Sequence, residues 1–353
     1  MTIDLDDLKT IRPIDTANMG SLLIGFSRQV SQGIELGRAV SIDLPKDDLR
    51  HILVIGMGGS AIGGDLLRSY LSPHLRIPVL VNRNYKLPRF AGPGTLTFVV
   101  SYSGNTEETQ SAFQVARKEG CFPVLITSGG RLASEGARYS FPVIIVPPGL
   151  PPRVALGYLF FPLLGLLEKI GLAPPQQEAL KETEDLLFQL SQAYSPQCPT
   201  YANMAKQLAL KLQGKIPWVY GVQDHTEAIA LRWKGQMNEN SKALAVYNLF
   251  PELNHNEIAG WEVSERFLEE IALVFLNDKD DLPRISKRME ITAKLAGQSG
   301  IQVLQAISEG KNRLARLFSL IYLGDFVSYY LALLKGVDPT PVASLDYLKR
   351  ELA

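Results

Sequence analysis

Hydrophobic and polar positions follow two alternating periods along most of the chain. Short apolar runs, typical of buried strands, are separated by longer stretches in which apolar residues recur every three or four positions, as on one face of a helix. Strands that alternate with helices in this way predict an α/β fold, with parallel sheets covered by helices on both faces. The alternation occurs once in each half of the chain, so we expect two similar domains.

The first half contains the elements of one complete α/β domain. We expect strands at residues 51–55, 77–81, 97–102, 122–127 and 141–146, helices at 60–70 and 106–119, and a long apolar helix that begins near Arg153. Before this domain, apolar residues at helical spacing between Met19 and Val30 predict a helical segment that packs on it.

The second half repeats the alternation after a segment that carries four prolines around a helical pattern. We expect strands at residues 216–220, 243–247, 271–275 and 300–305, and helices at 226–238, 284–296 and 312–334. The predicted organisation is a helical N-terminal segment (1–50), a first domain (51–171), a connector (172–199), a second domain (200–338) and a C-terminal helix (339–353).

The charge balance bears on possible partners. Lys plus Arg and Asp plus Glu each number 36, so no net field draws the whole protein toward nucleic acid or an anionic membrane. Any anion site must therefore be local. The longest apolar run, residues 156–167, contains Pro162 and is shorter than the roughly 20 residues of a membrane-spanning helix. We therefore expect a buried helix there.

The cysteines and the N-terminal sequence give information about the cellular compartment of the protein. Cys121 and Cys198 are far apart in the sequence and lack a Cys-x-x-Cys spacing, which argues against a disulfide framework and against a zinc site. The acidic start of the chain does not resemble a signal peptide. A cytoplasmic location is expected.

A glycine-rich turn follows the first predicted strand. The segment Gly56-Met57-Gly58-Gly59-Ser60-Ala61 leads into a helix, where unpaired N–H groups and the helix dipole favour an anion. A tight turn that binds nothing is the alternative. The segment also satisfies the dinucleotide pattern G-x-G-x-x-A. However, the next strand ends Val81-Asn82-Arg83, without the acidic residue that would hold a ribose, although Arg83 leaves NADP open.

Three hydroxyl side chains surround the start of the helix predicted at 106–119. Ser101, Ser103 and Thr106 would lie around unpaired N–H groups, which suits a phosphate monoester without a metal. A simple N-cap formed by Ser103 or Thr106, with Glu107 or Glu108 in the first turn, would need only one hydroxyl. The S-x-S-x-x-T spacing therefore predicts a phosphate-binding loop.

Together, these two loops resemble those of sugar isomerase (SIS) domains, and in particular the bifunctional phosphoglucose/phosphomannose isomerase family. The resemblance covers most of residues 15–353. It implies two SIS-type doubly wound domains and an aldose–ketose isomerase that interconverts glucose 6-phosphate, and mannose 6-phosphate, with fructose 6-phosphate through an enediol, without cofactor or metal. The residues it implies at the 6-phosphate are Ser101, Ser103 and Thr106, and those beside the sugar are Gly58, Gly59 and Ser60.

This reaction requires a base that moves a proton between C1 and C2, an acid/base that opens the ring, and a cation for the enediolate. A lone glutamate at a helix end is usually solvated. The segment Glu239-Asn240-Ser241-Lys242, however, resembles the one that bears the base in the family, which implies this role for Glu239.

By the same resemblance, Asn254-His255-Asn256-Glu257 carries the ring-opening histidine, which related isomerases place in the neighbouring subunit's site. This implies a homodimer in which His255 is shared. The residues themselves also allow an Asn254 N-cap with a returning bond from Glu257. The nearby apolar residues Leu253, Ile258 and Trp261 would anchor the segment, against a second chain or within the same one.

The resemblance assigns two cations and a threonine. Arg153, after Pro151-Pro152, matches the arginine that faces the enediolate, and Lys349 in the last helix matches a lysine that assists ring opening. Thr340 corresponds to a threonine linked to mannose tolerance.

Two alternatives stay open. One is an isomerase for an amino-sugar phosphate, and the other is a non-catalytic sugar-phosphate sensor, which would keep Ser101, Ser103 and Thr106 without needing Glu239. The second domain lacks a hydroxyl cluster after its strand at 271–275, so we expect one phosphate site per chain.

Overall fold

The computed structural model describes residues 3–44, 46–262 and 266–352. Residues 1–2 and 353, at the ends of the predicted terminal segments, and residues 45 and 263–265 lie outside the described residues. The chain divides into two compact units. The first-sheet unit comprises Phe26–Asp185 and Asn312–Leu314, and the second-sheet unit comprises Met1–Gly25, Leu186–Lys311 and Ala315–Ala353.

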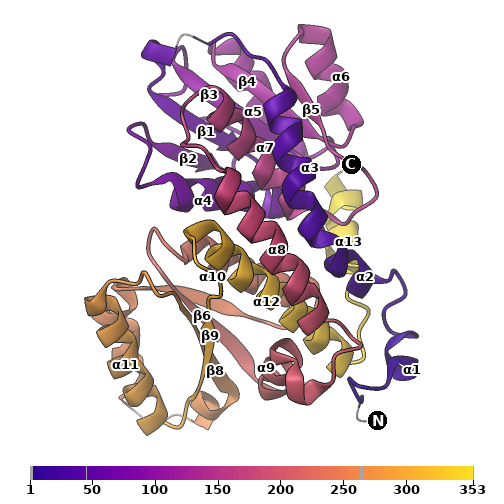
Figure 1. Cartoon of the computed structure of the whole chain (residues 1–353), viewed down its shortest axis with the longest axis vertical. Helices are drawn as coiled ribbons and strands as arrows, with labels where there is room; N and C mark the ends of the chain where they lie inside the picture. Colours follow the sequence, from indigo (N-terminus) through magenta and orange to yellow (C-terminus); the bar gives the residue numbers. More distant parts are fainter. Residues whose placement is uncertain (1–2, 45, 263–265, 353) are drawn as a thin grey trace. The chain divides into compact units, whose positions relative to one another are not determined.

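Five parallel strands form the sheet of the first-sheet unit, in the order β2-β1-β3-β4-β5 (Figure 1). Their bounds are β1 His51–Ile55, β2 Val79–Asn82, β3 Thr95–Val100, β4 Phe122–Thr127 and β5 Val143–Ile145. Since β2 and β4 lie on opposite sides of the β1–β3 pair, the chain turns outward in both directions from that pair. This is the doubly wound arrangement that the alternation predicted.

Helices cover both faces of this sheet. On one face, α5 and α6 enclose an apolar cluster that includes Leu53, Val99, Phe113 and Leu132. On the other, α7 packs against both α3 and α4. The helices of this unit are α3 Arg28–Ala39, α4 Gly58–Leu71, α5 Glu107–Lys118, α6 Gly130–Tyr139, α7 Leu156–Lys169 and part of α8 Gln177–Ala193, with 3-10 turns η1 Gly25–Ser27, η2 Lys46–Asp48 and η3 Pro152–Val154.

The second-sheet unit contains four parallel strands in the order β7-β6-β8-β9. Their bounds are β6 Ile216–Val222, β7 Val246–Phe250, β8 Ile271–Asn277 and β9 Gln302–Ile307. When the strands of each sheet are numbered along the chain, both sheets begin with the order 2-1-3-4. The first sheet adds a fifth strand at the end. The two halves therefore share a topology, as expected from the repeated sequence pattern.

One face of the second sheet carries an apolar cluster that joins Tyr220, Phe250 and Phe275 to Met289 of α11 and to Trp261. The helices of this unit are α1 Leu8–Ile11, α2 Met19–Ile24, α9 Met204–Leu212, α10 Glu227–Glu239, α11 Pro283–Gln298, α12 Arg313–Leu334 and α13 Ala343–Leu352, with 3-10 turns η4 Thr200–Ala202, η5 Glu252–His255, η6 Glu257–Trp261 and η7 Arg266–Glu270.

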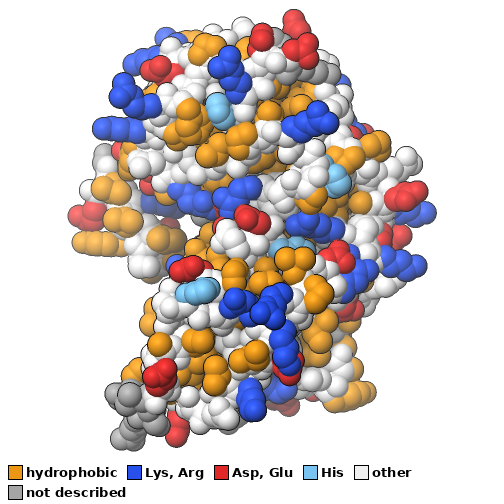
Figure 2. Space-filling model, turned by 90° about the vertical axis from the view of Figure 1, so that its left-hand side faces the viewer, with side chains coloured by type: hydrophobic (Ala, Val, Ile, Leu, Met, Phe, Trp, Pro, Cys, Tyr) orange, Lys and Arg blue, Asp and Glu red, His pale blue; other side chains and the backbone are white. Residues whose placement is uncertain are grey.

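Helix α12 has the length of a membrane-spanning helix and a mean hydropathy of 1.6, but its apolar window is 100% buried inside the protein. Polar contacts within the unit fix it as well, since Trp233 Nε1 donates to Leu320 O at 2.9 Å and Tyr322 Oη donates to Leu23 O at 2.8 Å. We therefore interpret α12 as a core helix. Figure 2 shows side chains of both charge signs among hydrophobic ones, in keeping with the balanced composition.

The α/β prediction with two parallel sheets is confirmed, but two helices have no counterpart in it. Helix α6 is 10 residues long and buries only Leu132 and Gly136, so few large apolar side chains mark it in the sequence. Helix α9 buries Lys206, whose ammonium group donates to the carbonyl oxygens of Leu5, Pro196 and Cys198 at 2.8–2.9 Å. A fully buried lysine interrupts the apolar period from which a helix is recognised.

The expected N-terminal helical segment differs from the structure in one respect. Helix α3 packs on α7 in the first-sheet unit, as expected, whereas residues up to Gly25 belong to the second-sheet unit. Their polar ties are made there, for example from Tyr322 to Leu23 O and from Tyr329 Oη to Asp15 Oδ2 at 3.0 Å.

Candidate active site

The glycine turn and the hydroxyl loop lie at the carboxyl ends of β1 and β3, the central pair at which the strand order reverses. Ligands of open α/β sheets bind in the crevice at this point. The two loops are in close contact, because a Cβ added to Gly56 would lie 3.0 Å from Val100 O. The sequence therefore builds a single edge from two separate motifs.

The hydroxyl loop leads into α5. Ser101 is buried and its Oγ lies 2.9 Å from Thr106 Oγ1. Thr106 occupies the N-cap position of α5, but its side chain makes no capping hydrogen bond. Ser103 is exposed and its Oγ accepts from Asn105 N at 3.3 Å. The simple N-cap interpretation of Thr106 is therefore wrong, and the hydroxyls gather at the start of the helix.

The shape of the loop is fixed by its neighbours. Gly104 has φ of +72°, and a Cβ there would lie 1.9 Å from Gly129 O, so only glycine fits. Its carbonyl oxygen accepts from Leu132 N at 3.0 Å and from Gln110 Nε2 at 2.7 Å. Asn105 Oδ1 accepts from Arg131 N at 3.0 Å. The loop is thus preorganised by the start of α6, the helix that the sequence pattern did not reveal.

The glycine turn lies against the segment that carries Arg153. Helix α4 begins at Gly58, and a Cβ on Gly59 would lie 3.2 Å from Pro152 O and 3.6 Å from Arg153 Cα. Arg153 is buried, within the 3-10 turn η3 rather than at the start of the long helix α7. The backbone that carries the buried Arg153 therefore lies next to the turn.

Tyr102 connects these pieces, and its role was not anticipated. Its backbone N–H lies 3.4 Å from Ser60 Oγ, and its phenol oxygen donates to Pro147 O at 2.8 Å and accepts from Leu150 N at 3.0 Å. Burial raises the pKa of this tyrosine, so the phenol stays neutral. Tyr102 lies between Ser101 and Ser103 in the sequence, and this position within the predicted phosphate loop could have indicated its role.

Arg83, the residue that left NADP open, has an acidic partner within its own unit. Its guanidinium group forms an ion pair with Asp65 of α4, whose side chain is almost fully buried. Among the residues that the structure describes, no group of three or more His, Cys, Asp and Glu side chains is placed to hold a metal ion.

At the equivalent edge of the second sheet, the loop that follows β8 carries charged residues instead of hydroxyl groups. Asp278, after β8, is buried and accepts from Ser308 Oγ at 2.6 Å and from Arg316 Nε at 2.9 Å, with His225 Nε2 at 3.1 Å. Burial alone would raise the pKa of Asp278, but the hydrogen bonds from His225 and Arg316 hold it far below its usual range. A carboxylate that is held by hydrogen bonds therefore occupies this edge, and its negative charge would repel a phosphate.

Glu239 is the last residue of α10 and is half-buried. The next two residues are buried completely. Asn240 Nδ2 donates to Ser328 Oγ at 3.0 Å, and Ser241 Oγ donates to Ser328 O at 2.7 Å. The exit of the helix is therefore fixed to α12.

The rest of α10 is joined to α12 by a buried ion pair. Arg232 Nε and Nη2 donate to the two carboxylate oxygens of Asp325 at 3.1 and 2.7 Å, and Gln236 Nε2 donates to Asp325 Oδ1 at 2.8 Å. Both members of the pair are almost fully buried. The helix that ends at Glu239 is thus held by specific bidentate geometry.

His255 ends the short turn η5, and its side chain is exposed. Leu253 and Trp261 are buried in the apolar cluster of their own chain, and Ile258 packs against the same cluster. These anchors therefore supply no evidence of a subunit interface. The interpretation of Asn254 as N-cap is wrong, because Asn256 caps η6, its Oδ1 accepting from Glu257 N at 2.6 Å.

Glu239 and His255 lie at opposite edges of the second sheet. Strands β6 and β7 are parallel, so α10 returns the chain from the carboxyl end of β6 to the amino end of β7. Glu239 ends α10 at that amino edge, whereas His255 follows the carboxyl end of β7. The five residues of β7 alone span about 16 Å.

Lys349 lies on α13, a helix without buried residues, and its side chain is exposed. Thr340 is half-buried, and its N–H donates to Asp338 Oδ1 at 2.8 Å. Lys242 Nζ donates to Asp338 O at 2.6 Å, which ties the segment after Glu239 to the Thr340 loop.

The structure thus brings seven of the predicted residues to one edge of the first sheet: Gly58, Gly59, Ser60, Ser101, Ser103, Thr106 and Arg153. Glu239, His255 and Lys349 belong to the second-sheet unit.

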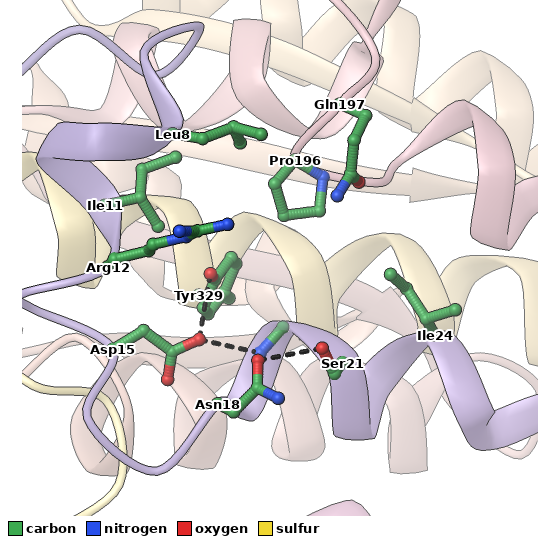
Figure 3. Close-up of a pocket in the computed structure, with 11 residues that line it drawn as sticks. Leu8, Ile11, Arg12, Asp15, Asn18, Ser21, Ile24, Pro196, Gln197 and Tyr329 are labelled. Atoms are coloured by element: carbon green, nitrogen blue, oxygen red, sulfur yellow. Dashed lines mark hydrogen bonds between the residues drawn. The ribbon is translucent and has the colours of Figure 1, made fainter.

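A pocket of about 330 Å³ in the second-sheet unit contains none of these residues (Figure 3). Its polar centre is Asp15, whose carboxylate accepts from Met19 N at 2.7 Å, from Gly20 N at 3.0 Å and from Tyr329 Oη at 3.0 Å. These bonds join the N-terminal segment to α12, so the lining already satisfies this carboxylate.

Two family models match the chain. Residues 48–148 match the SIS domain family, and residues 201–352 match the family described as the bacterial phospho-glucose isomerase C-terminal SIS domain. A glucose-6-phosphate isomerase like protein from Thermus thermophilus superposes with a TM-score of 0.66 at 18% identity, covering 97% of this chain and 99% of that chain, which shows the shared fold.

Two curated relatives are more informative. A protein named bifunctional phosphoglucose/phosphomannose isomerase from Caldicellulosiruptor bescii is 47% identical over 325 residues, 92% of this chain and 96% of the relative. A protein of the same name from Aquifex aeolicus is 37% identical over 314 residues, 88% of this chain and 93% of the relative. The chain therefore belongs to the bifunctional phosphoglucose/phosphomannose isomerase family.

Proposed function

We propose that this protein interconverts glucose 6-phosphate and mannose 6-phosphate with fructose 6-phosphate by proton transfer through an enediol. The observation that carries the proposal is the hydroxyl loop at the start of α5, which adjoins the glycine turn and a buried arginine. An N-terminal helix end with hydroxyl donors suits the dianionic 6-phosphate, and the adjacent turn admits the sugar.

Each step of the reaction has a candidate group. Ser101, Ser103 and Thr106 bind the 6-phosphate, while Gly58, Gly59 and Ser60 line the sugar. Glu239 takes the proton from C2 of the aldose and returns it to C1, so that one base serves both directions. Arg153 stabilises the negative charge on the enediolate oxygens. His255, assisted by Lys349, moves the proton between the ring oxygen and the C1 hydroxyl when the ring opens.

The active unit that we propose is a cytoplasmic homodimer in which the partner's His255 completes each site. The placement of Glu239 and His255 at opposite edges of one sheet supports this, because a single chain would have to bring both to the same carbon atoms. A two-fold contact supplies both composite sites at once. Helix α13 offers exposed apolar side chains at helical spacing, Leu345, Leu348 and Leu352, which suit burial against a second chain.

The proposal is tested by coupled assays with glucose 6-phosphate, mannose 6-phosphate and fructose 6-phosphate. Turnover of all three is expected, because the family acts on both epimers. Turnover of glucosamine 6-phosphate alone would favour the amino-sugar alternative. Binding of fructose 6-phosphate without turnover of any substrate would favour a sensor, and Glu239→Gln would then leave every measured property unchanged.

A further inference from the structure

The carboxyl group of Glu257 joins two neighbouring strands. Tyr220 Oη donates to Glu257 Oε1, and Asn248 Nδ2 donates to Glu257 Oε2. Tyr220 on β6 and Asn248 on β7 are register partners, so their side chains emerge on the same face of the sheet. One side chain from η6 therefore bridges both strands.

Both donors are fixed by their own surroundings. Tyr220 is completely buried, and its ring stacks on Phe275 with centroids 5.6 Å apart. Asn248 Oδ1 accepts from Leu249 N at 2.8 Å, which directs the amide nitrogen toward Glu257. The bridge is consequently attached to the rigid part of the sheet.

The segment around Glu257 is held at several other points. Leu253 and Trp261 are buried, and Asn254 Nδ2 donates to Thr292 Oγ1 of α11 at 2.8 Å. Against these anchors, the side chain of His255 is exposed. These contacts fix the segment on its buried side, while the imidazole group of His255 is exposed to solvent.

We propose that Glu257 is a positioning residue for His255, clamping the η5–η6 segment to β6 and β7 through Tyr220 and Asn248. The proposal rests on the proposed role of His255 in ring opening. Glu257 lies two residues after His255, so a shift of its carboxyl group moves the backbone that carries the imidazole. A misplacement of about 1 Å is sufficient to cost about 100-fold in rate.

The same contacts argue against Glu257 as the base that moves the proton between C1 and C2. Each of its carboxyl oxygens is already engaged by a protein donor. Burial raises the pKa of Glu257 to about 7, which by itself would suit a base, so only the two donor contacts count against this role.

The test compares four variants: Glu257→Ala, Glu257→Gln, His255→Ala and the double variant His255→Ala/Glu257→Ala. We expect Glu257→Ala to lower kcat about 10- to 100-fold, with the Kd for fructose 6-phosphate unchanged because the phosphate loop is untouched. Glu257→Gln should recover part of the loss, since its amide oxygen still accepts from Tyr220. Glu262→Ala, an exposed neighbour, is the matched control and should match the wild-type rate.

The double variant gives the decisive reading. If Glu257 acts through His255, the double variant is no slower than His255→Ala alone, whereas losses that multiply would show that Glu257 acts independently and would overturn the proposal. Full activity of Glu257→Ala beside an inactive His255→Ala overturns the positioning role alone. Full activity of His255→Ala overturns the proposed function of His255, and the clamp with it.

Tyr220→Phe covers the case in which Glu257→Ala does not fold. It removes one hydroxyl group and keeps the buried ring, so the aromatic cluster is retained. We expect a lower kcat in this variant and no further loss when His255→Ala is added. An unchanged kcat for Tyr220→Phe, with native circular dichroism and thermal unfolding, would contradict the clamp.

Discussion

Ser101 Oγ and Thr106 Oγ1 lie 2.9 Å apart across the turn that leads into α5. The pair uses one hydroxyl from the end of a strand and one from the N-cap position of a helix. Because Thr106 does not cap the helix with its side chain, the first N–H groups of α5 and the two hydroxyls lie together where we propose that the 6-phosphate binds. A phosphate oxygen would replace a contact that the protein now makes with itself.

The first prediction concerns this loop. Ser103→Ala together with Thr106→Ala should weaken fructose 6-phosphate binding about 100-fold or more, because each lost hydrogen bond to a charged group is worth about 1.5–3 kcal/mol. Calorimetric titration measures the loss. Ser134→Ala, an exposed serine on α6, serves as control. Undiminished affinity in the folded double variant would place the phosphate elsewhere.

The second prediction concerns Glu239. Glu239→Gln removes the proton acceptor but keeps the size of the side chain, so turnover should fall by about 10²- to 10⁴-fold. Affinity for fructose 6-phosphate should stay within a factor of about two, because the phosphate loop is unchanged. A stopped assay for glucose 6-phosphate and calorimetry give the two quantities. Retained turnover would show that another group moves the proton.

Strands and helices were predictable where the residues that become buried recur at a regular spacing in the sequence. Strands 51–55 and 122–127 were predicted with the bounds that the structure gives, since their apolar runs end at turn residues. Helices α6 and α9 were not, because one buries few side chains and the other buries a lysine. The division of the N-terminal segment between two units depends on tertiary contacts, which leave no periodic trace in sequence.

The positions of the two loops of the candidate site were predictable because local backbone chemistry forms them. The two loops join a strand to a helix, so their glycines and hydroxyls are read directly from sequence. The contacts of Tyr102 and Glu257 reach across 45 and 37 residues to Pro147 and Tyr220, and such pairings arise only when the sheet has formed. The roles of Glu239 and His255 came from family resemblance, and remain predictions.

The third prediction concerns the buried pair Arg232–Asp325. Asp325→Asn leaves the guanidinium group buried without its counter-charge, which should destabilise the protein by about 3–5 kcal/mol. Urea unfolding measures this, with Glu290→Gln on the exposed surface of α11 as control. We also expect slower turnover in this variant at urea concentrations below its unfolding midpoint. The ion pair holds α10, and Glu239 is the last residue of that helix. A loss below about 1 kcal/mol would show that the pair contributes little beyond a surface ion pair.

The fourth prediction concerns pH. Burial raises the pKa of Glu257 from 4.5 to about 7, so the folded state holds a proton that the unfolded state has released. The contribution of Glu257 to stability is therefore fully present below pH 4.5 and is lost as pH rises to about 7. Relative to Glu257→Gln, the wild-type protein should lose stability over this window.

The size of that loss is limited. A full shift would correspond to about 3 kcal/mol, and partial exposure of the side chain reduces it through solvent screening. Thermal unfolding of both proteins between pH 4.5 and 8 gives the difference. A constant difference in unfolding temperature across this range would show that the pKa of Glu257 is not raised.

The fifth prediction follows from the opposite placement of Glu239 and His255. If the partner's His255 completes each site, Glu239→Gln and His255→Ala variants that each retain only a small residual activity alone should complement each other when their subunits exchange. In a mixed dimer, one composite site combines an intact Glu239 with an intact His255, while the other contains both substitutions. Random exchange of equal amounts makes half of the dimers mixed, so about a quarter of wild-type activity should return.

The experiment needs proof that exchange occurs. Differently tagged variants can be dissociated in mild denaturant, refolded together and captured in succession on both tags, which isolates the mixed dimer. The isolated mixed dimer should then show about half of the wild-type turnover per dimer, because one of its two sites is intact. If mixed dimers are recovered and no activity returns, the two groups act within one chain. The opposite edges of the second sheet would then have to serve separate steps rather than one shared site.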